Sequence, residues 1–346
     1  MINAKLMIIA QKWLRRNTKY IVLYMVSNMN IVETEGVKKY YPVRGTIFSR
    51  QKRFIKALDG ISLNIEKGEI YSLVGETGSG KTTLGKILVG LIPPTEGAVK
   101  IDGIDIYSLR KKEIKQLRKK VQMIFQDPYE SLDPKYKVKD IIEEPLKFNH
   151  IEYSKDRIIE LLDFVSLKPP EDFINKYPFQ LSGGQRQRVA IARALAISPE
   201  FIIADEPVSM LDASIRANFL NILKDMNRNY NLSILMITHD ISIASYMGKR
   251  ISVLYRGKIV EQGSTYEIIK NPLHPYTIAL IESIPLIGKR DKEVHIKDEI
   301  SSNISVDKGC NFYPRCPFAM DICKEKEPEL EVISQNHLVA CFLYKQ

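Results

Sequence analysis

The sequence predicts an α/β protein with a mixed sheet at its core, a helical insert and a small C-terminal extension that contains the cysteines. Apolar runs typical of buried strands, EIYSLV, FIIAD and SILMIT, alternate with helical stretches from about residue 29 onward. This is the pattern of a mostly parallel sheet covered on its faces. Between about 127 and 180 the apolar runs become helical and prolines are frequent. The stretch RISVLYRGKIVEQG then has the two-residue turn of an antiparallel hairpin, Arg256-Gly257.

We divide the chain into three segments. An N-terminal extension spans residues 1–28, the main α/β domain spans residues 29–270 with its helical subdomain at about 127–180, and a C-terminal extension spans residues 271–346. The formal net charge is +10. Half of it comes from the N-terminal extension, which contains no acid and five basic residues: Lys5, Lys12, Arg15, Arg16 and Lys19. The remaining chain is only mildly basic, so we expect no nucleic-acid partner.

The N-terminal extension does not have the order of a secretory signal. Its two short apolar runs, LMIIA and IVLYMV, are not followed by a small-residue cleavage site. Met25 and Met29 offer later starts. We therefore expect residues 1–28 to be an upstream extension of the reading frame or a disordered tail. No apolar run reaches the roughly 18 residues of a membrane-spanning helix, so any membrane role would need a partner.

The stretch GETGSGKT fits the G-x-x-x-x-G-K-[ST] pattern of a phosphate-binding loop. It follows the strand EIYSLV and precedes the helical stretch TLGKILVGL, the context that separates such a loop from a flexible turn. Lys81 would place its charge on the β- and γ-phosphates of a nucleotide, and Thr82 would offer a hydroxyl to Mg²⁺. The predicted nucleotide-binding residues of this loop are Gly75, Gly78, Ser79, Gly80, Lys81, Thr82 and Thr83.

The stretch FIIADEP is a buried strand that ends in two carboxylates. Neighbouring side chains at a strand end point in different directions, so the two acids can do different work. Asp205 suits Mg²⁺, and Glu206 suits the activation of a water molecule aimed at the γ-phosphate. Taken alone, such a pair is often a solvated strand end.

A second candidate phosphate cradle is the stretch LSGGQ, a Ser-Gly-Gly turn that opens into a helix. Its backbone N–H groups and helix N-terminus can bind an anion, but no lysine stands beside it. The candidate residues are Ser182, Gly183, Gly184 and Gln185.

Together these motifs resemble those of an ABC-type ATPase, in order and in spacing. They are GETGSGKT, Gln126 in QMIFQDP, LSGGQ, FIIADE, SMLD and His239 in ITHD. The resemblance implies a domain that binds ATP and Mg²⁺ and works as a head-to-tail pair, with LSGGQ of one chain facing the nucleotide on the lysine loop of the other. It also implies that Gln126 contacts Mg²⁺ or water, that His239 holds the γ-phosphate, and that Asp212 closes the loop reaching across the dimer. The adenine would stack on an aromatic residue of VKKYYPV, where alignment favours Tyr41 over Tyr40.

A narrower resemblance covers nearly all of residues 30–346. VKKYYPV, QMIFQDPYESLDP, DEPVSMLD and NPLHPYT are similar to the ATP-binding subunits of the oligopeptide and dipeptide permease family. This implies a subunit at the cytoplasmic face of the membrane that drives peptide import with a second, usually non-identical ATPase subunit, two membrane subunits and an external substrate-binding protein. Relatives of this type also serve oligosaccharides and nickel. The alternative class is a soluble ABC-type machine, although such machines usually fuse two domains or separate the motifs by a long coiled coil.

Four cysteines lie within the last 37 residues of the chain, and they are Cys310, Cys316, Cys323 and Cys341. Their spacing lacks the CxxC pairs of common zinc sites. Four thiolates can satisfy zinc or a [4Fe–4S] cluster. The resemblance to the oligopeptide and dipeptide permease family favours the cluster, which some members of that family are thought to carry in this segment. The alternatives are reduced cysteines that pack a small cap, or a redox sensor that gates the ATPase.

Overall fold

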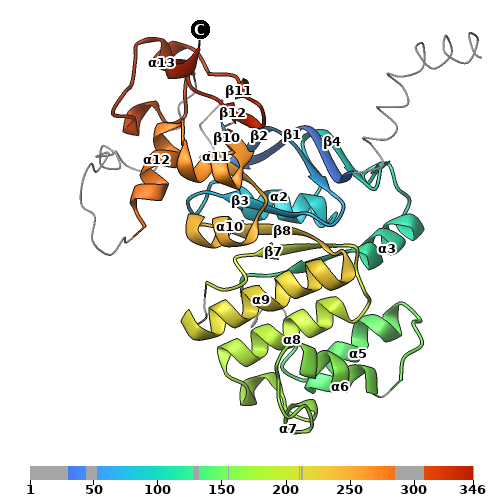
Figure 1. Cartoon of the computed structure of the whole chain (residues 1–346). Coiled ribbons are helices and arrows are strands. Elements are labelled where there is room, and N and C mark those ends of the chain that lie inside the picture. Colours follow the sequence, from blue (N-terminus) through green and yellow to red (C-terminus); the bar gives the residue numbers. More distant parts are fainter. Residues whose placement is uncertain are drawn as a thin grey trace, which may run out of the picture.

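The computed structural model describes residues 30–43, 53–127, 132–154, 156–209, 211, 213–284 and 308–345. The predicted N-terminal extension and Asp212 lie outside these residues. Two sheets make up the described fold (Figure 1). An antiparallel sheet has the order β2-β1-β4-β5, and its strands are β1 (Asn30–Val43), β2 (Arg53–Glu66), β4 (Glu96–Ile101) and β5 (Ile104–Asp105).

The second sheet carries the candidate site and has the order β11-β12-β10-β9-β3-β8-β7-β6. Its strands are β3 (Ile70–Val74), β6 (Val121–Ile124), β7 (Phe201–Asp205), β8 (Ser233–Thr238), β9 (Arg250–Tyr255), β10 (Lys258–Ser264), β11 (Glu331–Ser334) and β12 (His337–Val339). From β9 to β6 the neighbours pair in parallel, whereas β10, β12 and β11 pair antiparallel. The predicted mixed α/β fold class is confirmed.

The predicted hairpin is the pair β9 and β10. Its turn residues have positive φ angles, 43° at Arg256 and 79° at Gly257. Positive φ at both central residues matches the right-handed twist of the flanking strands. The turn also supports the phosphate loop, because the Gly257 N–H donates to the Ser79 carbonyl at 2.8 Å.

Helices divide into an upper group and a group beneath the parallel strands (Figure 1). The upper group consists of α2 (Lys81–Leu88), α10 (Ile241–Met247), α11 (Thr265–Lys270) and α12 (Pro275–Glu282), whereas α3 (Lys111–Lys120) lies at the side and leads directly into β6. Beneath the strands lie α5 (Val138–Phe148), α6 (Asp156–Phe164), α7 (Glu171–Ile174), the 3₁₀ turn η1 (Pro178–Gln180), α8 (Gly183–Leu195) and α9 (Ala213–Tyr230). No helix in the described part of the chain is long and apolar enough to cross a membrane.

Two apolar clusters hold these layers together. One packs α2 between the antiparallel sheet and strands β3, β7 and β8, and the other packs α5, α6, α8 and α9 against the opposite face of β7 and β8. Burial of this apolar surface is the main term that positions the strand ends where the candidate site lies. The subdomain boundaries drawn from the sequence stay predictions.

The C-terminal extension joins the main sheet, since β12 pairs with β10 through Glu261 and Val339. Its remaining elements are η2 (Tyr313–Arg315), α13 (Ile322–Glu325) and η3 (Phe342–Tyr344). The fully buried carboxylate of Glu261 accepts hydrogen bonds from the Leu273 N–H at 2.8 Å and the His274 N–H at 2.9 Å, and lies 2.7 Å from the His337 Nε2. One buried acid therefore ties the start of the extension, β10 and β12 to one another.

His274 gives the stability a defined pH dependence. Burial lowers its pKa to about 3, and its Nδ1 accepts the Tyr276 N–H as the N-cap of α12. The unfolded chain binds a proton below pH ~6.5 whereas the folded chain does not, so stability falls as the pH falls through this window. From pH ~7 to ~5 we expect a loss of about 2 kcal/mol from this residue. His274→Asn keeps a capping side chain and should flatten that part of the denaturant-measured pH profile. An unchanged slope in the variant would contradict the assignment.

Candidate ATP site

The phosphate loop connects β3 to α2, and two of its glycines cannot be replaced without a clash. A Cβ at Gly75 would lie 2.1 Å from the Leu254 carbonyl oxygen, and one at Gly80 would lie 2.3 Å from the Ala57 carbonyl oxygen. Gly80 also has a φ of 107° and Gly78 a φ of 82°, a region that side chains disfavour. These two glycines therefore let the loop pack directly against the backbone of β9 and β2. Helix α2 begins directly after the loop and carries Thr82 and Thr83 in its first turn.

Lys81 is buried at the start of α2, with 4% of its surface exposed. Its Nζ donates to the carbonyl oxygens of Gly75 at 2.6 Å and Glu76 at 2.8 Å. Burial lowers its pKa, and the neighbouring carboxylates of Glu206, Asp205 and Glu76 oppose this shift. The ammonium group is thus held inside the loop, where a bound phosphate would need it.

Asp205 ends β7 and is 2% exposed. Its carboxylate is hydrogen-bonded by the Thr82 side chain, yet burial raises its pKa. Its Oδ1 is buried without a hydrogen-bond partner among the described residues. A buried, unsatisfied carboxylate oxygen beside a threonine hydroxyl fits a divalent cation with oxygen ligands, because such an atom is costly to leave unpaired.

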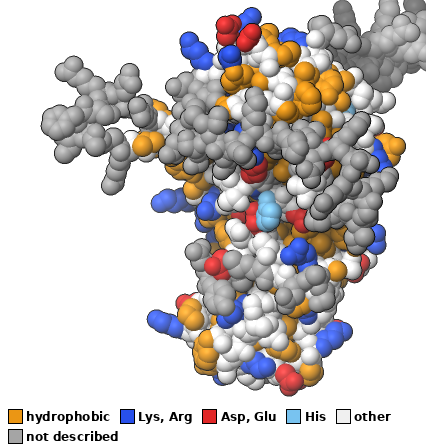
Figure 2. All heavy atoms as spheres, turned by 90° about the vertical axis from the view of Figure 1, so that its left-hand side faces the viewer, with side chains coloured by type: hydrophobic (Ala, Val, Ile, Leu, Met, Phe, Trp, Pro, Cys, Tyr) orange, Lys and Arg blue, Asp and Glu red, His pale blue; other side chains and the backbone are white. Residues whose placement is uncertain are grey.

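The three predicted catalytic side chains lie together. The Gln126 Nε2 donates to the Glu206 Oε2 at 3.1 Å, and the His239 Nδ1 lies 3.2 Å from the same oxygen. Glu206 follows β7, Gln126 follows β6 and His239 follows β8, so the carboxyl ends of three neighbouring parallel strands bring them together. Figure 2 shows a histidine and acidic side chains gathered near the middle of one face of the molecule.

The backbone at Glu206 is strained, with a φ of 45°. Its N–H donates to the Ile237 carbonyl at 2.9 Å, which holds this conformation. Such conformations cost about 1–3 kcal/mol and cluster where a side chain must be aimed. Here the turn keeps the Glu206 side chain only 11% exposed while it faces the exposed His239 ring.

The LSGGQ turn caps α8, in the lower group of helices, whereas α2 lies in the upper part (Figure 1). The Ser182 hydroxyl accepts the Gln185 N–H at 3.3 Å, and the Gln185 Oε1 accepts the Ser182 N–H at 3.0 Å. This capping box leaves the first N–H groups of the helix available. A Cβ built at Gly183 would meet no atom within 4 Å, so this glycine is not required by contacts within the chain.

The two tyrosines of VKKYYPV differ in their surroundings. The Tyr40 hydroxyl donates to Asp59 at 2.5 Å, and burial together with this hydrogen bond raises the pKa of Tyr40. Tyr41 is 39% exposed, and the Lys39 ammonium lies 5.3 Å from the centroid of its ring. The availability of the Tyr41 ring supports the sequence-based choice of this residue for stacking, and the choice stays a prediction.

All four cysteines line one small cavity of about 20 Å³. None of the four is in a disulfide, and burial raises the pKa of Cys310 to about 11 and that of Cys341 to about 12. Among the described residues, however, no group of three or more Cys, His, Asp or Glu side chains is spaced to hold a metal ion. The structure therefore gives no support for the expected iron–sulfur or zinc site.

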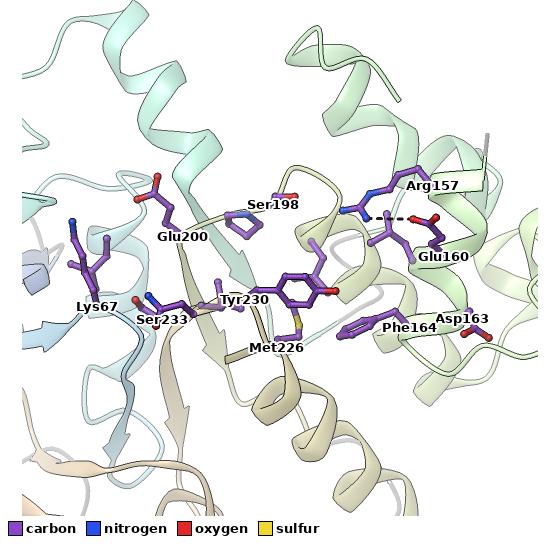
Figure 3. Close-up of a pocket in the computed structure, with 16 residues that line it drawn as sticks. Lys67, Arg157, Glu160, Asp163, Phe164, Ser198, Glu200, Met226, Tyr230 and Ser233 are labelled. Carbon is purple, nitrogen blue, oxygen red and sulfur yellow. Dashed lines mark ion pairs between the residues drawn. The ribbon is translucent and has the colours of Figure 1, made fainter. Parts of the chain in front are cut away.

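A larger cavity lies elsewhere among the described residues. It measures about 680 Å³ and is lined by Phe164, Met226 and Tyr230 together with residues at the amino ends of β7 and β8, such as Glu200 and Ser233 (Figure 3). None of the predicted site residues lines it. In open parallel sheets ligands bind at the carboxyl ends of the strands, so the size of this cavity does not make it the nucleotide site.

Sequence reasoning missed two residues that contact the phosphate loop. Arg315 donates to the Glu76 carboxylate, and the Tyr276 hydroxyl accepts the Glu76 N–H. No motif signals either contact, since an arginine between cysteines and a tyrosine after His-Pro carry no loop signature by themselves.

A phosphate loop, a buried aspartate with an unpartnered carboxylate oxygen, a strained glutamate at the adjacent strand ends and an LSGGQ helix start are together the features of an ATPase of the ABC class. Residues 58–209 match the family described as "ABC transporter", and residues 260–323 match "Oligopeptide/dipeptide transporter, C-terminal region". The chain belongs to the family of ATP-binding subunits of oligopeptide and dipeptide ABC transporters.

Individual relatives agree over nearly the whole chain. The oligopeptide transport ATP-binding protein AppF of Bacillus subtilis is 43% identical over 322 residues, which cover 91% of this chain and 97% of the relative. The dipeptide transport ATP-binding protein DppF of Haemophilus influenzae is 40% identical over 321 residues, with the same coverage. The dimeric post-hydrolysis structure of the ATP-binding cassette MJ0796 with ADP and Pi is 36% identical, has a TM-score of 0.61, and covers 68% of this chain and 98% of its own.

Proposed function

We propose that this chain is an ATP-hydrolysing subunit that drives the import of dipeptides or oligopeptides through separate membrane subunits. The observation that carries the proposal is the contact of Glu206 with both Gln126 and His239 at the strand ends beside the phosphate loop. Peptides are the cargo in the names of the relatives AppF and DppF. Oligosaccharide or nickel uptake is the alternative within this machinery, and a soluble ABC-type machine is the alternative outside it.

The described residues suggest a division of work in ATP hydrolysis. The Lys81 loop binds the phosphates, with Tyr41 stacking on the adenine. Mg²⁺ would be held by Thr82, Asp205 and Gln126, and it supplies neutralisation of the phosphate charge. Glu206 acts as the base toward water, and its contact with His239 orients both groups. A general base contributes about 10²–10⁴-fold to the rate.

The position of the LSGGQ turn supports a head-to-tail pair. Ser182 caps α8 and Gly183 and Gly184 begin it, in the lower group of helices, and a Cβ at Gly183 would have open space around it. In the partner-shared arrangement this turn serves the γ-phosphate bound by the other chain, and Gln185 keeps the turn capped. Asp212, outside the described residues, belongs to the same proposed contact. The related cassette MJ0796 is dimeric, and we propose a non-identical second ATPase as the partner.

An apolar groove beside Gln126 suits the membrane subunits, which would hold the chain at the cytoplasmic face of the membrane. It measures about 240 Å³ and is lined by Leu91, Phe125 and Pro145, among others. Leu91 is 50% exposed and Phe125 37% exposed. Because Phe125 directly precedes Gln126, closure of the ATP site would move one wall of this groove. The external substrate-binding protein would act on the far side of the membrane.

The cavity lined by the four cysteines has no role in the proposed mechanism of ATP hydrolysis. Its four thiols fit a [4Fe–4S] cluster or zinc in type and number, whereas their spacing in this structure holds neither. Anaerobic purification followed by iron, sulfide and zinc assays decides between the two groups and reduced cysteines.

Uptake by the native host tests the proposed function. Cells that carry Glu206→Gln in place of the wild-type chain should lose uptake of labelled di- and oligopeptides to the level of a deletion strain. Uptake of labelled nickel and maltooligosaccharide should not change. If peptide uptake stays normal and uptake of nickel or of maltooligosaccharide is lost, the lost compound replaces peptides as the proposed cargo. Normal uptake of all three compounds would reject the transport role.

A further inference from the structure

Every polar backbone and side-chain group of Glu76, the second residue of the phosphate loop, has a partner. Its N–H donates to the Tyr276 hydroxyl at 2.8 Å, and its carbonyl accepts from the Lys81 Nζ at 2.8 Å. Its carboxylate accepts two hydrogen bonds from Arg315, at 2.8 Å from Nη1 and 3.0 Å from Nη2. Tyr276 and Arg315 both belong to the C-terminal extension. This extension therefore holds two of the three polar groups of Glu76, its N–H and its carboxylate.

Arg315 is itself fixed by an aromatic cluster. Its guanidinium lies 5.9 Å from the ring centroids of both Tyr255 and Phe312. The rings of Tyr255, Tyr276 and Phe312 are buried and contact one another, with centroids 4.7–5.5 Å apart. The Arg315 side chain is only 15% exposed, so it cannot turn away into solvent without opening this cluster.

The backbone that carries Arg315 is part of the segment that contains the four cysteines, residues 310–341, called the cysteine segment below. Arg315 directly precedes Cys316, whose N–H donates to the Phe312 carbonyl at 3.0 Å. The Cys310 N–H donates to the Cys323 carbonyl at 2.8 Å, which closes the segment around η2. Cys316 and Cys323 both line the cavity described above.

The charge of Glu76 makes this arrangement matter for ATP. A carboxylate in the phosphate loop repels a bound polyphosphate unless a cation compensates it. The bidentate pair with Arg315 supplies that compensation and also fixes the carboxylate, as planar guanidinium pairs do.

We propose that Arg315 and Tyr276 are positioning residues of the ATP site, through which the C-terminal cysteine segment keeps the phosphate loop competent to bind nucleotide. The inference rests on the proposed function of the Lys81 loop. It assigns the C-terminal extension a role in nucleotide affinity beyond the family's shared ATP motifs.

Binding of Mg²⁺ and the ATP analogue AMP-PNP, measured by calorimetry on the full chain, tests this inference. Arg315→Gln should raise Kd by about tenfold, because it leaves the Glu76 charge uncompensated beside the phosphates. The double variant Arg315→Gln/Glu76→Gln should recover most of the affinity, since the repelling charge is gone. Tyr276→Phe removes only the acceptor of the Glu76 N–H and should raise Kd about threefold; it keeps the test open if Arg315→Gln does not fold.

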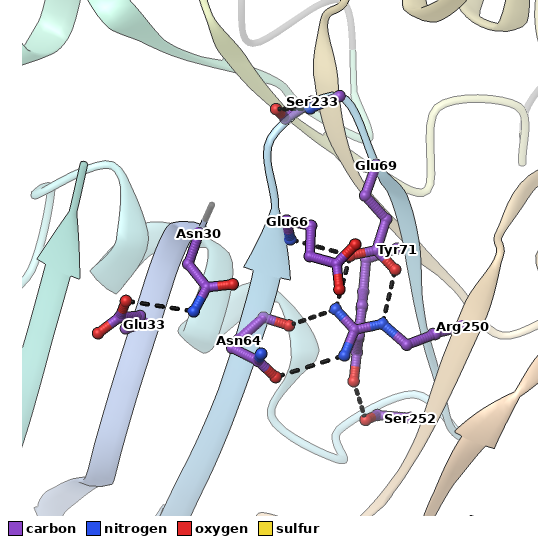
Figure 4. A network of polar contacts seen from close by, with 10 residues as sticks. Asn30, Glu33, Asn64, Glu66, Glu69, Tyr71, Ser233, Arg250 and Ser252 are labelled. Carbon is purple, nitrogen blue, oxygen red and sulfur yellow. Dashed lines mark hydrogen bonds and ion pairs between the residues drawn. The ribbon is translucent and has the colours of Figure 1, made fainter. Parts of the chain in front are cut away.

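A matched control lies at the other end of β3. Arg250 makes the same kind of bidentate pair with Glu69, at 2.7 Å from Nε and 2.6 Å from Nη2 (Figure 4). Arg250→Gln should lower the melting temperature and leave Kd unchanged, and Arg250→Lys replaces it if the Gln variant does not fold.

The outcomes separate the inference from the proposed function. If the wild-type chain does not bind AMP-PNP, the proposed function falls and the inference with it. If the wild-type chain binds and folded Arg315→Gln and Tyr276→Phe bind equally well, only the inference is overturned. An equal loss in the Arg250 control, or no recovery in the double variant, would reduce Arg315 to a contributor to stability and also overturn it.

Discussion

Glu206→Gln is expected to lower steady-state ATP turnover by at least about 100-fold while ATP binding stays within about twofold of wild type. The substitution removes a carboxylate that a strained backbone, at a φ of 45°, directs toward both Gln126 and His239. A glutamine can keep the hydrogen bond to Gln126 but cannot take a proton from water. Phosphate release and calorimetric ATP binding, measured on the same preparation, check the two halves of this expectation.

The matched control for this experiment is Glu200→Gln. Glu200 immediately precedes β7 on the amino side, whereas Glu206 follows it on the carboxyl side, and its carboxylate pairs with Lys120 at the surface. An exposed pair of this kind contributes little to stability. We therefore expect normal turnover in Glu200→Gln. Wild-type turnover in Glu206→Gln, or an equal loss in both variants, would remove Glu206 from its role as the base.

Residues whose positions follow from the chain's local order could be predicted from the sequence. Lys81 and Thr82 lie where a strand-loop-helix unit must place them, and Asp205 and Glu206 end a strand that is apolar throughout. Once the strands are parallel, their carboxyl ends share one edge of the sheet. The meeting of Gln126, Glu206 and His239 is a consequence of that geometry.

Contacts between distant segments could not be predicted in this way. Arg315 is 239 residues from Glu76 in the chain, and Tyr276 is 200 residues from it. Their approach depends on how the extension packs beside β9 and β10, which no periodicity encodes. The positive φ of Glu206 could not be predicted either, because glutamate has no preference for that region. The conformation is held by the hydrogen bond from the Glu206 N–H to the Ile237 carbonyl, which joins distant parts of the sequence.

The cysteine segment shows the limit of reasoning from residue type. Four cysteines in one segment indicate a shared role, and the structure does place all four around one cavity. Thiol spacing, however, is a matter of ångströms, and the described thiols are not arranged as a ligand set. The contact that this segment makes with the phosphate loop comes instead from the arginine beside Cys316.

Gly183→Asp is expected to abolish ATP-dependent dimerisation and lower turnover by at least about 100-fold while the single chain stays folded and still binds ATP. A Cβ at Gly183 has open space around it, since no other part of the described chain lies within 4 Å. A negative charge in the first turn of α8 also interacts favourably with the helix dipole, so stability should rise by about 0.3–1 kcal/mol. The same charge would face the γ-phosphate held by the Lys81 loop of the partner. The variant thus separates folding from pairing, because Gly183→Asp should raise the stability of the single chain and abolish its pairing.

Solution mass with and without ATP and Mg²⁺ measures the pairing, and thermal unfolding measures the stability. Because hydrolysis would end the paired state, the mass of the Gly183→Asp chain and of the chain with native Gly183 is measured with Glu206→Gln present in both. Turnover is compared between the same two chains without Glu206→Gln. Gly183→Ala serves as the size control and should lose far less, since it adds one methyl group and no charge. If the Glu206→Gln chain pairs only with a non-identical ATPase, its mass will not double alone, and the comparison is made on that complex. A Gly183→Asp chain that pairs and turns over ATP normally would show that the LSGGQ turn does not serve a partner's phosphate.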